Sequence, residues 1–539
     1  MNTKFKNFFM VAIMLLLLIL IGCNNKNGAG VDDVIKVSYT GFGAMETVGG
    51  SLHKLSVGTE NYVIDVGSFY GDEGSNYPLP SELDVKAIDA IFITHAHADH
   101  IGRLPLLLEN GYEGPIYMTS VTKDIAIIST LSNLIYSDLG IERFYYSRNN
   151  NSDAKPVYID GFNYGEFQVE DHNKMYINTK RSELNQKGFY LSGSTVDFLK
   201  MEMRDRLEDQ IVVVDYEESI NLSEEVAVEF FYTSHLPGSS MIYFTIGDKN
   251  ILFSGDIGSN NNPLLLRNSR FNHPIDYLFV EGTYGTNVNE YDTNVERQQL
   301  IEYMGSAIEN NERIIIPAFA VDRSQQILYE IRNGMMQSII PEDTNVKVYS
   351  PTIEEFINLY TSYSLDKENY TSYFSDNMFT DIFKINNLIV NPRQTGNSAY
   401  DLNVAHGEIA IMTSGMFSSG FSKEILKNYI NDDNTNLISV SYQDPDEVGG
   451  LVFGGDEVVT IDNVEYQMQA KIFSSPAFSG HANVEQIIDI FKEHSPEQIM
   501  IVHLNDRDKD SLIDYYSEQF QSSKIIVPEL KKQYSLYEY

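Results

Sequence analysis

The sequence predicts an α/β protein in which one fold is interrupted by a second α/β unit. Short apolar runs in the first half are each followed by a histidine or an acidic residue, which is typical of buried strands that carry metal ligands at their carboxyl ends. From about residue 287 the pattern changes to the alternating helices and strands of a parallel α/β insert. The segment from Lys471 returns to the first pattern. On length alone, about three or four domain-equivalents or one fold with a large insertion fit equally well.

The first 23 residues are predicted to be an export signal and not part of the fold. Lys4 and Lys6 precede an uninterrupted apolar run over residues 8–22, and Cys23 follows at once. Residues 20–23, Leu-Ile-Gly-Cys, resemble the bacterial lipobox, in which the cysteine is lipidated and becomes the mature N-terminus. An uncleaved signal anchor with an incidental cysteine is the alternative. Either one places the body outside the cytoplasm, extracytoplasmic or periplasmic, and tethered to the cell membrane by residues 24–34.

Composition limits the chemistry further. Cys23 is the only cysteine, so the chain has no internal disulfide and no metal site built from several thiolates. The formal net charge is −38, with the acidic excess spread along the chain. Such a surface repels nucleic acid, because affinity for the phosphate backbone comes largely from lysine and arginine.

The main candidate site follows the apolar run at residues 88–93. His95, His97, Asp99 and His100 lie within one hexapeptide, on the loop expected at the end of that strand. Imidazole and carboxylate together suit zinc and related divalent ions. A polar surface loop is the alternative, but the whole chain holds only 11 histidines, so this clustering favours a metal site.

Three further candidates lie at strand ends. Asp65 closes the strand predicted before the histidine loop; it is either a turn residue or an acid that orients a metal ligand or water. His235 follows the predicted strand 226–232, and Asp256 follows the strand 251–253. A lone histidine at a strand end is more often structural, but the repeated pattern favours a ligand.

The remaining elements are predicted from periodicity and turn residues. Helices are expected over residues 101–108 and 121–139, and after Asn483, which should cap its helix. An asparagine-rich loop is expected at 148–153. The other predicted strands cover residues 241–246, 276–280, 314–321, 346–349, 388–390, 409–412, 437–440, 471–473 and 499–502.

The order of these residues resembles the metallo-β-lactamase fold, and in particular its β-CASP branch, which includes RNase J and the cleavage and polyadenylation endonuclease. The resemblance extends from about Val37 to His503. It rests on the histidine loop with the three strand-end candidates, and on later segments whose order is more specific. These are Glu281-Gly282-Thr283-Tyr284-Gly285, the strand at 316–321 with Arg323, Ser414-Gly415-Met416, Ser479-Gly480-His481-Ala482-Asn483 and Val502-His503.

The resemblance implies an αββα sandwich with an α/β β-CASP domain inserted as a lid over the metal face. The implied domains are the N-terminal part of the metallo-β-lactamase domain over 35–286, the β-CASP domain over 287–470 and the C-terminal part over 471–539. It also implies two zinc ions. One would be held by His95, His97 and His235, the other by Asp99, His100 and His503, and Asp256 would bridge them.

The resemblance further assigns Glu281 and His481 to the acid and the histidine of the family's two β-CASP motifs. Two divalent ions about 4 Å apart can share one hydroxide as nucleophile and offset charge on a phosphodiester. His481 would then protonate the leaving alkoxide, oriented by Glu281. The alternatives are a helix-capping residue for His481 and a surface acid for Glu281.

Three departures from the family pattern bear on the substrate more than on the metals. Leu504-Asn505 follows His503 where the family has Gly-Glu, and Asn483 replaces an aspartate. Residues 441–447, Ser-Tyr-Gln-Asp-Pro-Asp-Glu, carry extra acids near the expected phosphate path.

The leading hypothesis is a zinc-dependent hydrolase that cuts phosphodiester bonds, with single-stranded RNA as substrate and a metal-bridging hydroxide as nucleophile. The predicted partners are this nucleic acid, the membrane through the lipid anchor, and a second copy in a homodimer. The second hypothesis is an exported hydrolase of a smaller ester or phosphoester. The third is a non-catalytic surface module.

Overall fold

The computed structural model describes residues 34–69, 78–133, 203–288, 292–396 and 399–539, together with two short strands at 158–159 and 162–163. The predicted signal peptide, Cys23, nearly all of the tether and the loop at 148–153 lie outside the described residues. Within the described part of the chain, no helix has both the length and the apolarity needed to cross a membrane.

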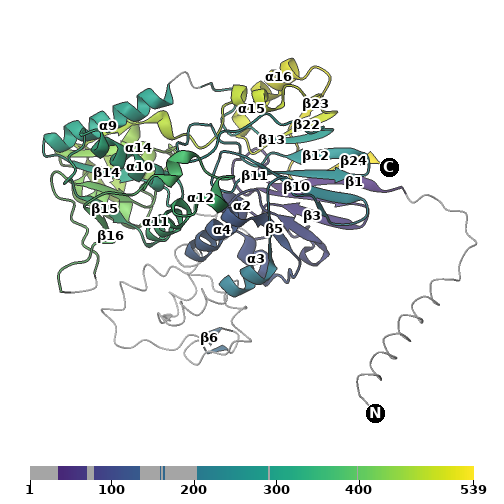
Figure 1. The fold of residues 1–539 in the computed structure, drawn as a ribbon, viewed down its shortest axis with the longest axis horizontal. Helices are drawn as coiled ribbons and strands as arrows, with labels where there is room; N and C mark the ends of the chain where they lie inside the picture. The colour runs from purple at the N-terminus through teal and green to yellow at the C-terminus, as the bar shows by residue number, and fades with distance from the viewer. Residues whose placement is uncertain are drawn as a thin grey trace, which may run out of the picture.

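Two seven-stranded mixed sheets form one half of the molecule (Figure 1). The first has the order β24 (Gln533–Glu538), β1 (Lys36–Gly43), β2 (Leu52–Val57), β3 (Glu60–Ile64), β4 (Ala90–Phe92), β5 (Ile116–Thr119) and β8 (Ile211–Val214). The second has the order β23 (Lys524–Ile526), β22 (Gln498–Val502), β13 (Tyr277–Glu281), β12 (Lys249–Phe253), β11 (Ser240–Ile246), β10 (Val226–Tyr232) and β9 (Ile220–Asn221).

The two sheets pack face to face over an aromatic core. Phe92 of the first sheet meets Phe244 of the second edge-on at 5.2 Å between ring centroids, and Phe253 stacks on Phe279 at 4.2 Å. All four rings are almost fully buried. Burying each phenyl ring contributes about 1.5–3 kcal/mol, so these rings fix how the sheets face each other and therefore where the strand ends meet.

Helices cover the outer faces of both sheets, which gives the predicted four-layer αββα arrangement. On the first sheet these are α2 (Ala98–Ile101), α3 (Leu104–Glu109) and α4 (Ser120–Asn133). On the second sheet they are α15 (Val484–Phe491) and α16 (Lys509–Gln519). The helix predicted to start at residue 121 starts at Ser120, and its described part ends at Asn133.

A third sheet of six parallel strands forms the other half of the molecule (Figure 1). Its order is β16 (Leu388–Val390), β15 (Val346–Tyr349), β17 (Ile409–Met412), β14 (Arg313–Pro317), β18 (Thr435–Ser439) and β21 (Lys471–Ser474). Its faces are covered by α9 (Thr293–Glu309), α10 (Arg323–Met336), α11 (Pro351–Ser364), α13 (Gly420–Tyr429) and α14 (Val448–Gly454). Minor elements are α12 (Lys367–Tyr370) and the strand pairs β19 (Val458–Ile461) with β20 (Val464–Gln467) and β6 (Tyr158–Ile159) with β7 (Phe162–Asn163).

The strand β21 directly follows the predicted end of the inserted unit. β21 pairs in parallel with β18, with Asn436 opposite Lys471 and Ser439 opposite Ser474. The strand β21 therefore belongs to the third sheet, beside the predicted domain boundary at residue 470. The apolar pattern of an edge strand does not tell which sheet it joins.

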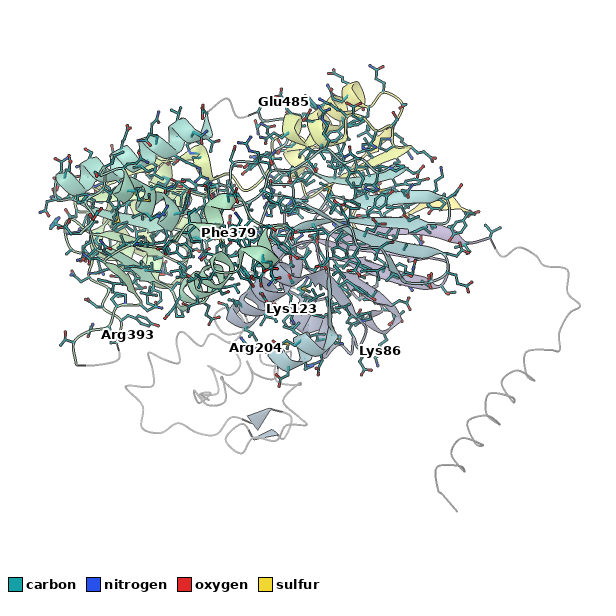
Figure 2. All side chains as sticks on the ribbon, viewed as in Figure 1. Lys86, Lys123, Arg204, Phe379, Arg393 and Glu485 are labelled. Atoms are coloured by element: carbon teal, nitrogen blue, oxygen red, sulfur yellow. The ribbon has the colours of Figure 1, made fainter. Side chains whose placement is uncertain are left out.

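The inserted unit is held against the sandwich by polar contacts and by a continuous apolar core. Tyr363 of α11 donates a hydrogen bond to Asp124 of α4 at 2.9 Å, and the hydroxyls of Ser132 and Thr352 lie 2.7 Å apart. Phe379 packs at the same junction (Figure 2). The lid is therefore fixed over one edge of the sandwich, the edge where the predicted ligands lie.

Candidate metal centre

Seven side chains from strand ends of both sheets meet in one buried cluster, which consists of two groups that share Asp256. The first group is His95, His97, His235 and Asp256, and the second is Asp99, His100, Asp256 and His503. Within each group, one ligand atom of every residue lies within 4.8 Å of the others. All seven residues predicted as ligands are thus brought together, from His95 to His503 along the chain.

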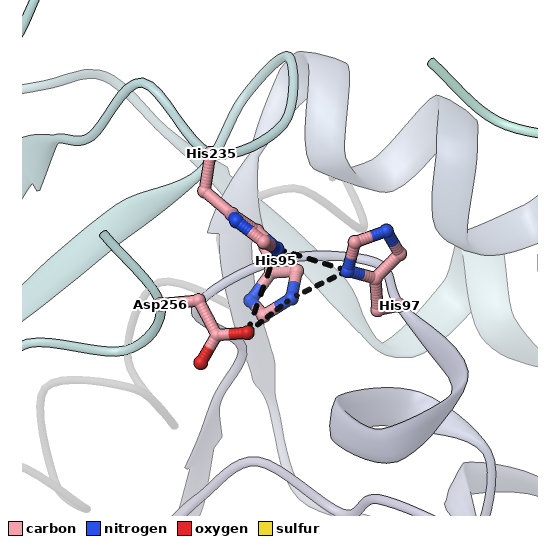
Figure 3. Close-up of side chains that lie close together, drawn as sticks. All are labelled: His95, His97, His235 and Asp256. Carbon is pink, nitrogen blue, oxygen red and sulfur yellow. Dashed lines mark hydrogen bonds and ion pairs between the residues drawn. The ribbon is translucent and has the colours of Figure 1, made fainter. Parts of the chain in front are cut away.

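In the first group, three imidazoles point their ring nitrogens at one another (Figure 3). Nδ1 of His97 lies 3.2 Å from Nε2 of His95 and 3.0 Å from Nε2 of His235. Asp256 Oδ2 lies 3.6 Å from Nε2 of His95 and 3.5 Å from Nε2 of His235. Three nitrogens and one carboxylate oxygen converging in this way form a donor set that suits a divalent cation.

In the second group, the donors are two carboxylates and two imidazoles. Nε2 of His503 lies 3.3 Å from Asp99 Oδ2, and Nε2 of His100 lies 3.4 Å from Asp256 Oδ1. Asp256 thus presents Oδ2 to the first group and Oδ1 to the second. This is the geometry that a carboxylate bridging two cations requires.

Hydrogen bonds outside the cluster fix the orientation of its imidazoles. Nδ1 of His100 lies 2.6 Å from Asp65, Nδ1 of His235 lies 2.9 Å from the Gly480 carbonyl, and Nδ1 of His503 lies 2.9 Å from Thr283 Oγ1. Each acceptor holds a proton on Nδ1, which leaves Nε2 directed into the cluster. Asp65 therefore lies where the sequence predicts, beside a candidate ligand.

Thr94 has the same role for His95. Its hydroxyl donates to Asp65, which leaves the oxygen free to accept from Nδ1 of His95 at 3.1 Å. Thr283 is similar, because it donates to Glu281 at 2.5 Å while it faces His503. Sequence analysis missed both threonines, although each lies within two residues of a predicted site residue, the position from which a side chain reaches the same strand end.

The unpaired atoms of the cluster fit bound cations. Among the described residues, Asp99 Oδ1, His100 Nε2 and Asp256 Oδ1 are buried and have no hydrogen-bond partner. Burying a polar atom without a partner is costly, and a cation would satisfy all three atoms. The residues thus fit two divalent ions, and nitrogen with oxygen donors is a set that zinc accepts.

Close backbone approach brings the ligand loops together. A Cβ on Gly67 would lie 1.5 Å from the Asp99 carbonyl oxygen, and a Cβ on Gly258 would lie 2.0 Å from the Ser234 carbonyl oxygen beside His235. Two non-glycine residues of the site, Asp65 and His503, have left-handed backbone angles, with φ of 60° and 51°. Such strain is found where the surrounding structure holds a functional residue in place.

His481 and Glu281 form a pair at the open side of the cluster. His481 Nδ1 donates to Glu281 Oε2 at 2.9 Å, and its Nε2 lies 3.9 Å from Asp256 Oδ2. The His481 side chain is 18% exposed, against 5% or less for the four ligand imidazoles His95, His100, His235 and His503. Burial alone would lower the pKa of His481, but Glu281 and Asp256 raise it to about 10. The imidazole is thus protonated at neutral pH and aimed at the space beside the ligands.

The alternatives for this pair do not match the structure. Glu281 is almost fully buried, so it is not a surface acid. The cap of α15 is Asn483, whose side chain accepts from the Gln486 backbone, as the sequence predicts, and the His481 side chain is engaged by Glu281. Asn483, which replaces the aspartate of the family pattern, thus caps α15. Leu504, another departure from that pattern, is buried in the core under α15 and α16.

Comparisons with known families follow the same division of the chain. Residues 56–122 match the metallo-β-lactamase superfamily, 324–451 match the Beta-Casp domain, and 465–528 match the Zn-dependent metallo-hydrolase RNA specificity domain. The chain therefore has a mixed α/β fold made of a metallo-β-lactamase domain with a β-CASP domain, as the sequence predicts.

Relatives along most of the chain are RNA-processing and transcription proteins by name. The chain is 26% identical to a ribonuclease of Thermus thermophilus, over 86% of this chain and 92% of the relative. It is 25% identical to the transcription termination factor FttA of Methanothermobacter thermautotrophicus, over 86% of this chain and 66% of that protein. It is also 25% identical to an Integrator complex subunit 11 homolog of Dictyostelium discoideum, over 86% of this chain and 56% of the relative.

Proposed function

We propose that this chain is a metal-dependent hydrolase that cleaves phosphodiester bonds in RNA, with two zinc ions held by the two groups around Asp256. The proposal rests on the position of Asp256 between the two groups. One of its carboxylate oxygens faces each group of ligands, at 3.4–3.6 Å. Ions bound there would supply Lewis acidity, which makes water a nucleophile near neutral pH and offsets phosphate charge.

The protein's own residues orient the metal ligands and donate a proton to the leaving group. Asp65, Thr94 and Thr283 hold the ligand imidazoles in place. His481, charged and held by Glu281, is proposed as the general acid that protonates the leaving oxygen, a role worth about 10²–10⁴ in rate. His481, whose side chain is 18% exposed, lies beside the buried ligands, so we propose that the substrate enters on its side.

RNA is the proposed substrate because the C-terminal part of the sandwich matches an RNA specificity domain and the relatives above include a ribonuclease. A smaller ester or phosphoester is the second candidate. It is favoured by the net charge of −38 and by Asp444, Asp446 and Glu447, which lie past the carboxyl end of β18 in the inserted sheet. The membrane anchor through Cys23, the extracytoplasmic location and the homodimer remain predictions.

A substrate panel with one ligand variant tests the proposal. The soluble body, with and without zinc, is incubated with labelled single-stranded RNA, single-stranded DNA and a generic phosphodiester. Zinc-dependent cutting of RNA is expected, and His97→Ala should abolish it by removing a first-group ligand. His494→Ala is the matched control, because His494 lies outside the cluster and bonds the Phe271 carbonyl.

Each other outcome has a distinct meaning. Cutting of the generic diester alone would favour the second candidate, and zinc binding without any turnover would favour a non-catalytic module. Location is tested separately, because acyl labelling that survives Cys23→Ala would contradict the lipoprotein prediction.

A further inference from the structure

A line of polar side chains runs from the metal cluster into the core between the two sheets. Ser51 Oγ donates to Asp65 Oδ2 at 3.3 Å and lies 3.1 Å from Nε2 of His53. On the other side of the ring, Nδ1 of His53 lies 2.9 Å from the hydroxyl of Tyr39. All four residues are 5% exposed or less.

The donors and acceptors along this line can be assigned from chemistry alone. The carboxylate of Asp65 only accepts, so the single hydroxyl proton of Ser51 goes to it. The oxygen of Ser51 must then accept from Nε2–H of His53. Nδ1 of His53 is thereby an acceptor, and the hydroxyl of Tyr39 donates its hydrogen bond to it.

The protonation of both rings agrees with this assignment. Burial, followed by the charges of His100 and His503, lowers the pKa of His53 to about 3, so the ring stays neutral. Burial also raises the pKa of Tyr39 well above its usual value, so its hydroxyl stays a donor. Every bond of the line therefore points the same way, toward Asp65.

The line ends directly beside the second metal group. Asp65, its end point, accepts from Nδ1 of His100 at 2.6 Å, and His100 belongs to the second group. A small cavity of about 20 Å³ is lined by residues of both parts: Ser51, His53 and Asp65 of the line, and His100, Asp256 and His503 of the second group. The first group touches the line only through Thr94, whose hydroxyl bonds both Asp65 and His95.

Buried polar groups at this depth are costly unless they form a fully satisfied network. An apolar pair would fill the space between the sheets more cheaply, as Phe253 and Phe279 do beside it. The free-energy cost of burying these polar side chains therefore has a physical reason if they position a residue of the metal cluster.

We propose that His53 and Tyr39 are positioning residues for the second metal group: they complete a one-directional chain of hydrogen bonds that holds Ser51 on the carboxylate of Asp65, and so fixes the carboxylate that orients His100 with Nε2 toward the metal. The inference rests on the proposed binding of two metals. It concerns metal affinity and not the chemistry of cleavage.

The test measures zinc affinity of each group separately, by competition with a chromophoric chelator. In a His97→Ala background only the second group keeps its full ligand set, and in a His503→Ala background only the first does. His53→Leu removes the donor and the acceptor, whereas His53→Gln keeps one of each. Tyr39→Phe removes only one oxygen atom, so it still tests the inference if the His53→Leu variant fails to fold.

In the His97→Ala background, His53→Leu should weaken zinc binding about 10-fold, the lower end for residues that support a ligand. Tyr39→Phe should weaken it less, and His53→Gln should restore most of it. In the His503→Ala background, all three should leave affinity nearly unchanged. Tyr62→Phe is the matched control, because Tyr62 is buried in the same core and bonds Glu60, away from the site.

Three results would overturn the inference. His53→Leu could weaken both groups equally, it could weaken neither, or Tyr62→Phe could weaken the second group as much as Tyr39→Phe, which would mean a general loosening of the core. A wild-type protein that binds no zinc at all would instead overturn the proposed function, and the inference with it.

Discussion

The two halves of the metal centre share one carboxylate but are built differently. The first group is three imidazoles on loops that lie under the inserted unit, and one of them, His235, is held by the carbonyl of Gly480, in the segment that returns from that unit. The second group contains two carboxylates and is anchored from within the sandwich by Asp65 and Thr283. The first group thus depends on the lid being in place, and the second on the core.

Their protonation differs in the same way. Burial lowers the pKa of His97 to about 4 and lowers the pKa of His95 well below its usual value, so these rings are neutral and ready to bind a cation. Burial would also lower the pKa of His100, but Asp256, Asp65 and Asp99 raise it well above its usual value. The second group therefore holds a proton that a metal ion must displace, whereas the first does not.

The largest effect is expected from the residue that both groups share. Asp256→Asn removes the negative charge between them, so both should lose zinc and cleavage should fall to background. The loss of affinity should exceed about 100-fold, the upper end for residues that only support a ligand. Metal content by mass spectrometry measures it, with Asp276→Asn as control at the far end of β13. Retention of one tightly bound zinc would show that the two groups are independent.

His481 should affect turnover without affecting either group's metal. His481→Gln removes the proposed general acid, so the rate should fall about 10²–10⁴-fold with two zinc ions still bound. Glu281 raises the pKa of His481, so the acid form should be lost, and wild-type activity should fall, only at alkaline pH, and the variant should lack this alkaline limb. Loss of a metal in the variant would contradict the role given to His481.

Sequence could predict the ligands because each lies in the segment that follows a strand, and strands are visible as apolar runs. It could also predict that the ligands converge, because their order along the chain resembles a known family. β24, by contrast, was not predicted: it pairs with β1, Lys36 opposite Glu538, and carries no chemical signal. Half-exposed edge strands such as β24 alternate too weakly to be distinguished from loops.

What sequence could not supply is the support behind the ligands. Thr94, Thr283 and the carbonyl of Gly480 each bond the Nδ1 atom of a ligand imidazole, but a threonine or a glycine beside a ligand is too common to be informative. His53 is the clearest case. It lies in the alternating pattern of β2 at an inward position, where its sequence alone indicates only an imperfect core residue.

The difference in protonation predicts that pH acts mainly on the second group. Zinc must displace the proton of His100 there, so affinity should rise about 10-fold per pH unit while that ring stays charged in the metal-free protein. The first group should change little near neutral pH. Calorimetry in buffers of different ionisation enthalpy, using the His97→Ala and His503→Ala backgrounds, counts the protons released. Equal proton release from both groups would remove this distinction.

The smallest predicted effects come from the two threonines, and their asymmetry is the sharpest test of how the groups are linked. Thr283→Val keeps the branched shape but removes the acceptor for His503, so only the second group should weaken, by about 10-fold or less. Thr94→Val removes the acceptor for His95 and also a donor to Asp65, which holds His100. Both groups should therefore weaken together, although Thr94 adjoins only a first-group ligand in sequence. A Thr94→Val effect confined to the first group would mean that Asp65 holds His100 without help from Thr94.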